Sequence, residues 1–259
     1  MRKGRPGVWI WRREAVNLKT TGKVDGLASR LLRAVLPLRC LLCGGMGADG
    51  RDLCDGCAQD CAINRVCCPR CALPLETPAP LCGDCLQHEP PFAAAWAPFR
   101  YGHPLDLLET RFKFGGDLAA GRVLADLLVE RAGIDVPPAL PALMIPIPLH
   151  VSRLRERGYN QALELARPLA QALGIPLRHD LLARSRATPP QTGLDAKARR
   201  RNLRGAFTLL APAPLADHVV LFDDVMTTGT TLREVARVLV QAGVARVDVW
   251  ALARAPHRR

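Results

Sequence analysis

The segment that decides the fold is Val219-Val220-Leu221-Phe222-Asp223-Asp224-Val225-Met226-Thr227-Thr228-Gly229-Thr230-Thr231-Leu232. Its first four residues are apolar and predict a buried parallel strand that ends at two carboxylates. A turn rich in hydroxyl groups follows, and residues 232–240 predict a helix. Ligands of open α/β sheets bind at the carboxyl ends of strands. A phosphate at the start of a helix meets free backbone N–H groups and the positive end of the helix dipole.

Each part of this segment suits a phosphorylated sugar. Gly229 lets the backbone approach a ligand and take a positive φ. Asp223 and Asp224 suit ribose hydroxyls or a magnesium ion, which prefers hard oxygen ligands. Further donors are the hydroxyls of Thr227, Thr228, Thr230 and Thr231. The segment therefore predicts a site for a ribose 5-phosphate, and the alternative is a turn whose Asp and Thr residues only cap a helix.

The length and net charge of the chain limit the classes of protein to which it can belong. The chain has 259 residues, which is room for one α/β domain and a small accessory module. The formal net charge of +12 favours an anionic partner: a nucleotide, pyrophosphate, nucleic acid or an acidic membrane surface. No run of about 18 apolar residues occurs, so we expect no membrane span and a cytoplasmic protein. Residues 1–24 read as a basic leader with too short an apolar stretch for a signal peptide, and residues 24–38 predict an amphipathic helix.

All ten cysteines lie between Cys40 and Cys85, and eight of them form C-x-x-C pairs. The pairs are Cys40/Cys43, Cys54/Cys57, Cys68/Cys71 and Cys82/Cys85, with ten residues between each pair and the next. Two such pairs complete a tetrahedral zinc site, so four pairs predict two structural zinc ions. A disulfide framework, redox-active pairs and iron–sulfur ligation are the alternatives.

Equal gaps do not fix how the pairs combine. Sequential, crossed and nested arrangements would each close a site of four thiolates, and we favour the sequential one. Cys61 and Cys67 are left over, and Cys67 adjoins Cys68. The segment has few large apolar residues, so metal would supply much of its folding energy. Zinc modules of this kind are often interaction modules, and nucleic acid is a frequent partner.

Pro90-Pro91 marks a boundary, which divides the chain into a leader region 1–37, a double zinc ribbon 38–90 and an α/β domain 91–259. In the last region we expect a strand or hairpin arm over 93–101. Helices are expected over 104–114, 117–132 and 161–173, with strands over 142–147 and 206–209. Asp117 is the candidate N-cap of the second helix. Lys113 lies just before it, either as a phosphate contact or as a solvated helix end.

A second strand–loop–helix unit spans residues 142–173. Arg153 and Arg157 lie four residues apart in its loop, so one helical turn would place both on one face. Two guanidinium groups on a face suit pyrophosphate. In a parallel sheet this loop should lie beside the Asp223-Asp224 loop. His150 is a candidate acid or base, although a structural role is the more common one for such a histidine.

Basic residues are concentrated between positions 151 and 205, with 12 Arg or Lys against four Asp or Glu. This excess predicts an anion-binding face, and a solvated surface is the alternative.

Several of these motifs together resemble the ComF family, which comprises competence-associated, phosphoribosyltransferase-like proteins. The motifs are the four C-x-x-C pairs with Cys68-Pro69-Arg70-Cys71, residues 146–150 (PIPLH), residues 157–161 (RGYNQ), Gln191 with residues 199–207 (RRRNLRGAF), and the Asp-Asp segment. The resemblance covers roughly residues 38–255. It implies a type I phosphoribosyltransferase fold, that is, an α/β fold with a parallel sheet flanked by helices, behind a zinc-ribbon module.

The resemblance also implies roles for residues. Asp223 and Asp224 would hold the ribose hydroxyls of 5-phosphoribosyl-1-pyrophosphate (PRPP), directly or through Mg²⁺. The residues that would cradle the 5-phosphate are Thr227, Thr228, Gly229, Thr230 and Thr231. The loop that ends at Arg157 and contains Arg153 would face the pyrophosphate. The run from Ala187 to Arg204 would be a mobile flap that closes over the ligand. Its anion contacts would be Gln191, Arg199 and Asn202.

The expected activity is displacement of pyrophosphate from ribose C1, with magnesium assistance and an acceptor that the sequence does not identify. One alternative is a non-catalytic protein that binds single-stranded DNA and uses PRPP as a regulator or not at all. Another is a regulatory protein that senses PRPP without turnover. Expected partners are a phosphoribosyl ligand and, in the DNA-binding alternative, single-stranded DNA or a DNA-uptake protein.

Overall fold

A computed structural model describes residues 38–186, 205–210 and 215–256 of the chain. The leader and nearly all of the helix expected over 24–38 lie outside these residues, as do Gln191, Arg199 and Asn202. Among the described residues, no helix has the length and hydropathy that crossing a bilayer requires.

The centre of the fold is a five-stranded sheet in which all strand pairs are parallel. The longest strands, β6 (His218–Met226) and β7 (Arg246–Arg254), lie side by side. β3 (Leu143–Pro146) pairs with β6 on one side, while β1 (Ala95–Trp96) and β2 (Phe99–Arg100) both pair with β7. The segment 93–101 is therefore two short parallel strands and not a hairpin arm.

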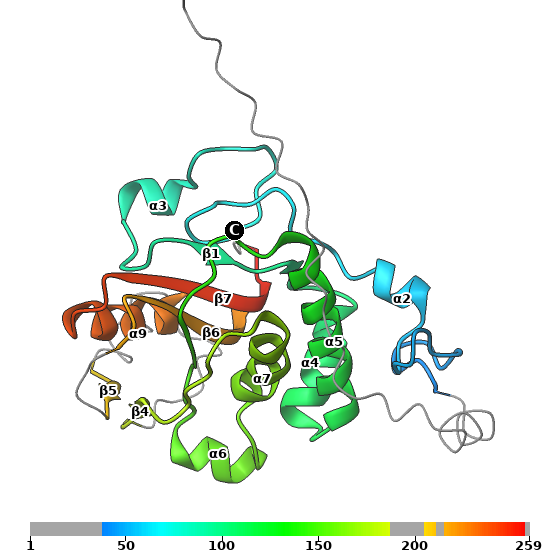
Figure 1. Cartoon of the computed structure of the whole chain (residues 1–259). Coiled ribbons are helices and arrows are strands. Elements are labelled where there is room, and N and C mark those ends of the chain that lie inside the picture. Colours follow the sequence, from blue (N-terminus) through cyan, green and yellow to red (C-terminus); the bar gives the residue numbers. More distant parts are fainter. Residues whose placement is uncertain (1–37, 187–204, 211–214, 257–259) are drawn as a thin grey trace, which may run out of the picture.

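Helices cover both faces of this sheet (Figure 1). One face carries α4 (Leu105–Phe114), α5 (Leu118–Asp135) and α7 (Gln161–Leu173), and the other carries α9 (Thr230–Gln241). Strand β6 alternates between the two sides, because Val220 and Phe222 pack with the first set and Val219 and Leu221 pack with α9. Burial on both faces explains why this strand is a continuous apolar run.

Local signals set the helix ends. Asp117 accepts hydrogen bonds from the N–H groups of Ala119 and Ala120, which confirms it as the N-cap of α5. Helix α7 begins after Asn160, whose side chain caps it, and ends at Gly174 in the left-handed conformation. A short helix, α6 (Val151–Arg157), occupies the loop after β3, and β4 (Leu182–Arg184) pairs with β5 (Phe207–Leu209) in a separate antiparallel sheet.

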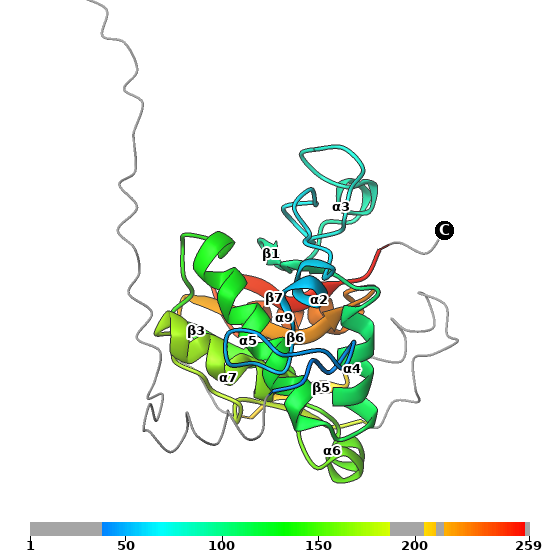
Figure 2. The same cartoon turned by 90° about the vertical axis from the view of Figure 1, so that its right-hand side faces the viewer.

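The two halves of the cysteine-rich segment lie in different places on the α/β domain (Figures 1 and 2). Its first half, with α2 (Asp55–Gln59), contacts α4 and α5: Arg51 pairs with Glu130 at 2.7 Å, and Arg111 donates to the carbonyl of Leu41 at 2.6 Å. Its second half, with α3 (Gly83–Gln87), shares a hydrophobic cluster with α9. The two halves therefore support different elements.

Candidate functional site

The two adjacent carboxylates lie within β6, because this strand continues to Met226 and does not end at Phe222 as the apolar run predicted. Asp223 Oδ1 accepts from the N–H of Asp224 at 3.0 Å, and Asp224 Oδ1 accepts from the N–H of Val225 at 2.6 Å. Burial, and next the charge of Asp224, raise the pKa of Asp223 well above its usual value.

A lysine from α4 reaches this pair. Lys113 Nζ lies 2.9 Å from Oδ2 of Asp224 and 2.8 Å from Oε2 of Glu109, which is fully buried. Burial alone would lower the pKa of Lys113, but Asp224 and Glu109 raise it above its usual value. Burial and the charge of Asp224 raise the pKa of Glu109 to about 7. Lys113 is thus not a solvated helix end, since its ammonium group pairs with Glu109 and with Asp224 of the acidic pair.

The next element is the threonine loop, residues 227–231. Gly229 has a φ of +70°, and a Cβ there would lie 2.7 Å from Cε of Met226. The hydroxyls of Thr228 and Thr230 lie 2.8 Å apart, and α9 begins at Thr230 with no side-chain cap. A small pocket is lined by residues 223 and 225–232. The uncapped helix start inside this pocket offers backbone N–H groups to an anion.

Both arginines expected to face pyrophosphate lie on α6, one turn apart and half-buried. Because β3 pairs in parallel with β6, the loop after β3 lies beside the acidic pair, as predicted. Burial and repulsion from Arg153 lower the pKa of Arg184, and Asp223 opposes them, so the three groups lie within electrostatic reach. Arg157 lies over the ring of Phe114, 5.1 Å from its centroid.

His150 is the N-cap of α6. Its Nδ1 accepts from the N–H of Ser152 at 3.2 Å and lies 2.8 Å from the hydroxyl of Ser152. This capping contact gives His150 a structural role at the start of α6.

The residues that sequence reasoning missed are Glu109, Arg184 and Arg254. Glu109 lies four residues before Lys113 on α4, which was a usable signal for an ion pair on one helix face. Arg254 ends the nine-residue strand β7, in which every residue except Arg246 is buried. Arginine is rarely buried without partners, so its place at the end of a mostly apolar run was a second usable signal.

The eight C-x-x-C cysteines form two groups. The first cysteine group is Cys40, Cys43, Cys54 and Cys57, and the second cysteine group is Cys68, Cys71, Cys82 and Cys85. Within each group the sulfur atoms lie within 4.8 Å of one another. Zinc at about 2.3 Å from four sulfurs in a tetrahedron would place them about 3.8 Å apart.

The Cys43–Cys54 and Cys71–Cys82 sulfur pairs lie at 3.7 and 3.6 Å, so both groups fit zinc. The sequential pairing is confirmed. All ten cysteines are free of disulfides, and Cys61 and Cys67 belong to neither group.

The acidic pair also fits a divalent cation by its charge. The carboxylates of Glu109 and Asp224 both pair with the ammonium group of Lys113, and Asp223 lies within its electrostatic reach. Oε1 of Glu109 is buried without a hydrogen-bond partner among the described residues. Mg²⁺ prefers hard oxygen ligands, and these carboxylates supply them.

Comparisons with known proteins agree with this architecture. Residues 31–86 match the double zinc ribbon domain, and residues 160–259 match the phosphoribosyl transferase domain. Competence protein F of Haemophilus influenzae is 38% identical over 84% of this chain and 97% of its own length. DNA utilization protein YhgH of Salmonella typhi is 38% identical over 78% of this chain and 90% of its own length.

A solved adenine phosphoribosyltransferase from Leishmania donovani is 16% identical and covers 64% of this chain and 62% of its own, with a TM-score of 0.34. That score is too low to carry an argument.

The parallel sheet, the family matches and the two cysteine groups define the class: this chain has a phosphoribosyltransferase-like α/β domain behind a double zinc ribbon. Its identity to Competence protein F and to YhgH over most of its length places it in the ComF family.

Proposed function

We propose that the chain binds PRPP, or a closely related phosphoribosyl ligand, at the carboxyl edge of β6 and β3. In this proposal the carboxylates of Asp223 and Asp224 accept hydrogen bonds from the ribose hydroxyls. The threonine loop and the start of α9 hold the 5-phosphate, and Arg153 and Arg157 face the pyrophosphate.

The observation that carries the proposal is the meeting of three features at one sheet edge. An acidic pair, an uncapped helix start and the arginine-bearing helix α6 come from two neighbouring strand–loop–helix units. Each feature alone is common in α/β proteins. A ligand with a diol between two phosphate groups would use all three at once.

We further propose that the bound ligand reacts at ribose C1, where pyrophosphate leaves and an acceptor attacks. Mg²⁺ bound beside the acidic pair would neutralise charge on the pyrophosphate. The carboxylates of Asp223 and Asp224 would stabilise positive charge that develops on the ribose, and Arg153 and Arg157 would stabilise the leaving group. Gln191, Arg199 and Asn202 are the residues proposed to close over the ligand. A cytoplasmic location would suit PRPP and ten reduced cysteines.

Calorimetric titration of the full chain with PRPP and Mg²⁺ tests the binding. We expect saturable binding that the double variant Asp223→Asn/Asp224→Asn abolishes. Asp180→Asn is the matched control, because this carboxylate is exposed and pairs with Arg178 rather than with a residue of the acidic pair's network. Unchanged affinity in the double variant, with a native circular dichroism spectrum, would reject the site.

Release of pyrophosphate in the presence of nucleobases or amines separates an enzyme from a sensor. Turnover in the wild type, lost in the double variant, supports phosphoribosyl transfer. Binding without any turnover supports a protein that senses PRPP.

A second candidate function is binding of single-stranded DNA. It is favoured by the printed names of the relatives, Competence protein F and DNA utilization protein, and by the net charge of +12. Fluorescence anisotropy with a labelled oligonucleotide at rising salt tests it. A steep loss of affinity with salt would indicate contacts to the phosphate backbone, whereas no binding at low salt would exclude this function.

A further inference from the structure

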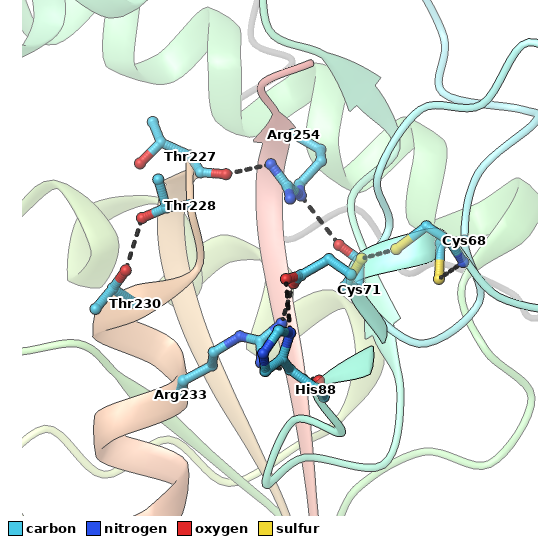
Figure 3. Close-up of polar contacts among 10 residues, drawn as sticks. Cys68, Cys71, His88, Thr227, Thr228, Thr230, Arg233 and Arg254 are labelled. Atoms are coloured by element: carbon cyan, nitrogen blue, oxygen red, sulfur yellow. Dashed lines mark hydrogen bonds and ion pairs between the residues drawn. The ribbon is translucent and has the colours of Figure 1, made fainter. Parts of the chain in front are cut away.

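The last residue of β7, Arg254, is buried although it carries a charge. Its Nη1 donates to the carbonyls of Met226 at 3.0 Å and Ala255 at 2.7 Å, and also to that of Thr227. Its Nε donates to the carbonyl of Cys71 at 3.0 Å. Figure 3 shows Arg254 between Thr227 and Cys71. One side chain thus joins the entry of the threonine loop to the second cysteine group.

A buried guanidinium group is costly unless its donors are satisfied, so these four carbonyls explain how the strand tolerates it. The contacts also constrain the carbonyls. With the oxygens of Met226 and Thr227 held toward Arg254, the path of the chain into the loop is fixed. The direction of the N–H groups that follow, those expected to meet a phosphate, is fixed with it.

A second arginine ties the other end of the loop to the same module. Arg233, in the first turn of α9, pairs with Oδ2 of Asp84 at 2.7 Å and donates to the carbonyl of His88 at 3.3 Å. Asp84 lies on α3, between the ligand cysteines Cys82 and Cys85. The loop is therefore held on both sides by residues in or beside the second cysteine group (Figure 3).

Packing adds to these polar contacts. Met226 and Leu232, which flank the threonine loop, belong to the same hydrophobic cluster as all four cysteines of the second group. The first cysteine group differs. Its segment contacts α4 and α5, and no hydrogen bond among the described residues joins it to residues 226–233.

We propose that metal in the second cysteine group sets the affinity of the threonine loop for its phosphorylated ligand, with Arg254 and Arg233 as the positioning residues. This inference rests on the proposed function, because it assigns regulation to the same site. Without metal the turn that carries the Cys71 carbonyl is no longer held, and Arg254 loses the anchor on that side. The loop then samples more conformations, and binding must order it again. Metal in the first group should not have this effect.

The experiment compares Cys85→Ser with Cys57→Ser in the full chain, since each removes the last ligand of one group. Zinc content, PRPP affinity by calorimetry, and amide hydrogen exchange of residues 226–233 are measured. Each variant should lose one zinc. Cys85→Ser should bind PRPP at least about tenfold more weakly and exchange faster in the loop. Cys57→Ser should match the wild type in both. An equal effect in the two variants, or none in either, overturns the proposal.

Arg254→Lys tests the link without touching a ligand cysteine, in case Cys85→Ser does not fold. A lysine keeps the charge but cannot reach carbonyls on two sides. This variant should keep both zinc ions, lose PRPP affinity and show faster exchange in the loop. Arg246→Lys, at the exposed start of the same strand, is its control. Hydrogen exchange needs no ligand, so it tests the link even if the wild type fails to bind PRPP and the proposed function falls.

Discussion

Lys113 Nζ lies 2.9 Å from Oδ2 of Asp224, and it joins helix α4 to the acidic pair of the central strand. The same ammonium group lies 2.8 Å from Oε2 of Glu109, and Asp223 lies within its electrostatic reach. This network sets the charge of the proposed ribose site before any ligand binds. The contribution of these charges to stability can be tested in the protein without ligand.

Replacing Lys113 with Met should destabilise the chain strongly. The change removes the cation and leaves the carboxylates of Glu109 and Asp224 unpaired in a buried place. Breaking a buried ion pair costs about 3 kcal/mol or more of unfolding free energy. Urea denaturation at pH 8 measures the loss.

Two variants make this test specific. Adding Glu109→Gln to Lys113→Met should recover part of the stability, because the neutral amide removes one of the unpaired charges. Arg178→Met removes a cation whose pair with Asp180 is exposed, and its stability should equal that of the wild type. A loss of the same size in Arg178→Met would mean that burial of the Lys113 network is not the cause.

Stability of the free protein should fall as the pH rises from about 4.5 to about 7. Burial and the charge of Asp224 raise the pKa of Glu109 from 4.5 to about 7 in the folded chain. Between these values the folded chain keeps a proton that the unfolded chain has lost, so rising pH favours unfolding. The contribution is of the order of 3 kcal/mol, complete below about pH 4.5 and gone above about pH 7.

Glu109→Gln isolates this contribution, since burial raises the pKa of Asp223 as well and other groups titrate in the same range. Unfolding free energies of wild type and variant are measured from pH 5 to pH 8 without Mg²⁺. The difference between the two curves should change steadily up to about pH 7 and then stay constant. A difference that is flat across this range would contradict the assigned pKa.

Local patterns predicted the elements well. The apolar run of β6, the caps of α5 and α7, and the C-x-x-C pairs depend on neighbours within a few residues, and these signals can be read from one sequence. The contact of Lys113 with Asp224 joins residues far apart in the chain, and only the packing of α4 on the sheet creates it. From the sequence, Lys113 could be a solvated helix end or a phosphate contact. The first interpretation was wrong, because its ammonium group pairs with Glu109 and Asp224, and the second stays a prediction.

The zinc pairing and the contacts of Arg254 also could not be predicted from local sequence patterns. Equal gaps between the cysteine pairs allow several pairings, and in the observed sequential one each group packs into a different hydrophobic cluster. Arg254 ends a strand whose other two charged residues, Arg246 and Asp248, pair with each other. Its partner, the carbonyl of Cys71, is a backbone atom that no sequence pattern indicates.

The protein as purified should hold two zinc ions per chain, and the ligand set should be specific. Cys61→Ser and Cys67→Ser should retain both ions, because neither sulfur belongs to a four-cysteine group. Cys43→Ser and Cys71→Ser should each lose one ion. Elemental analysis of the dialysed proteins gives the counts. Retention of two ions by Cys71→Ser together with loss of one by Cys67→Ser would mean that Cys67 replaces its neighbour as a ligand.

Gly229→Ala should reduce PRPP affinity at least about tenfold, by two effects of the added methyl group. The backbone at φ +70° is strained for an L-residue such as alanine, and the new Cβ would lie 2.7 Å from Cε of Met226, next to the proposed phosphate position. Gly174→Ala is the matched control, because φ is +67° and a Cβ there meets no atom within 4 Å. Both variants should lose about 1 kcal/mol of stability, but only Gly229→Ala should lose affinity in calorimetric titration with PRPP. Equal affinities in the two variants would show that the ligand phosphate does not approach the backbone at Gly229.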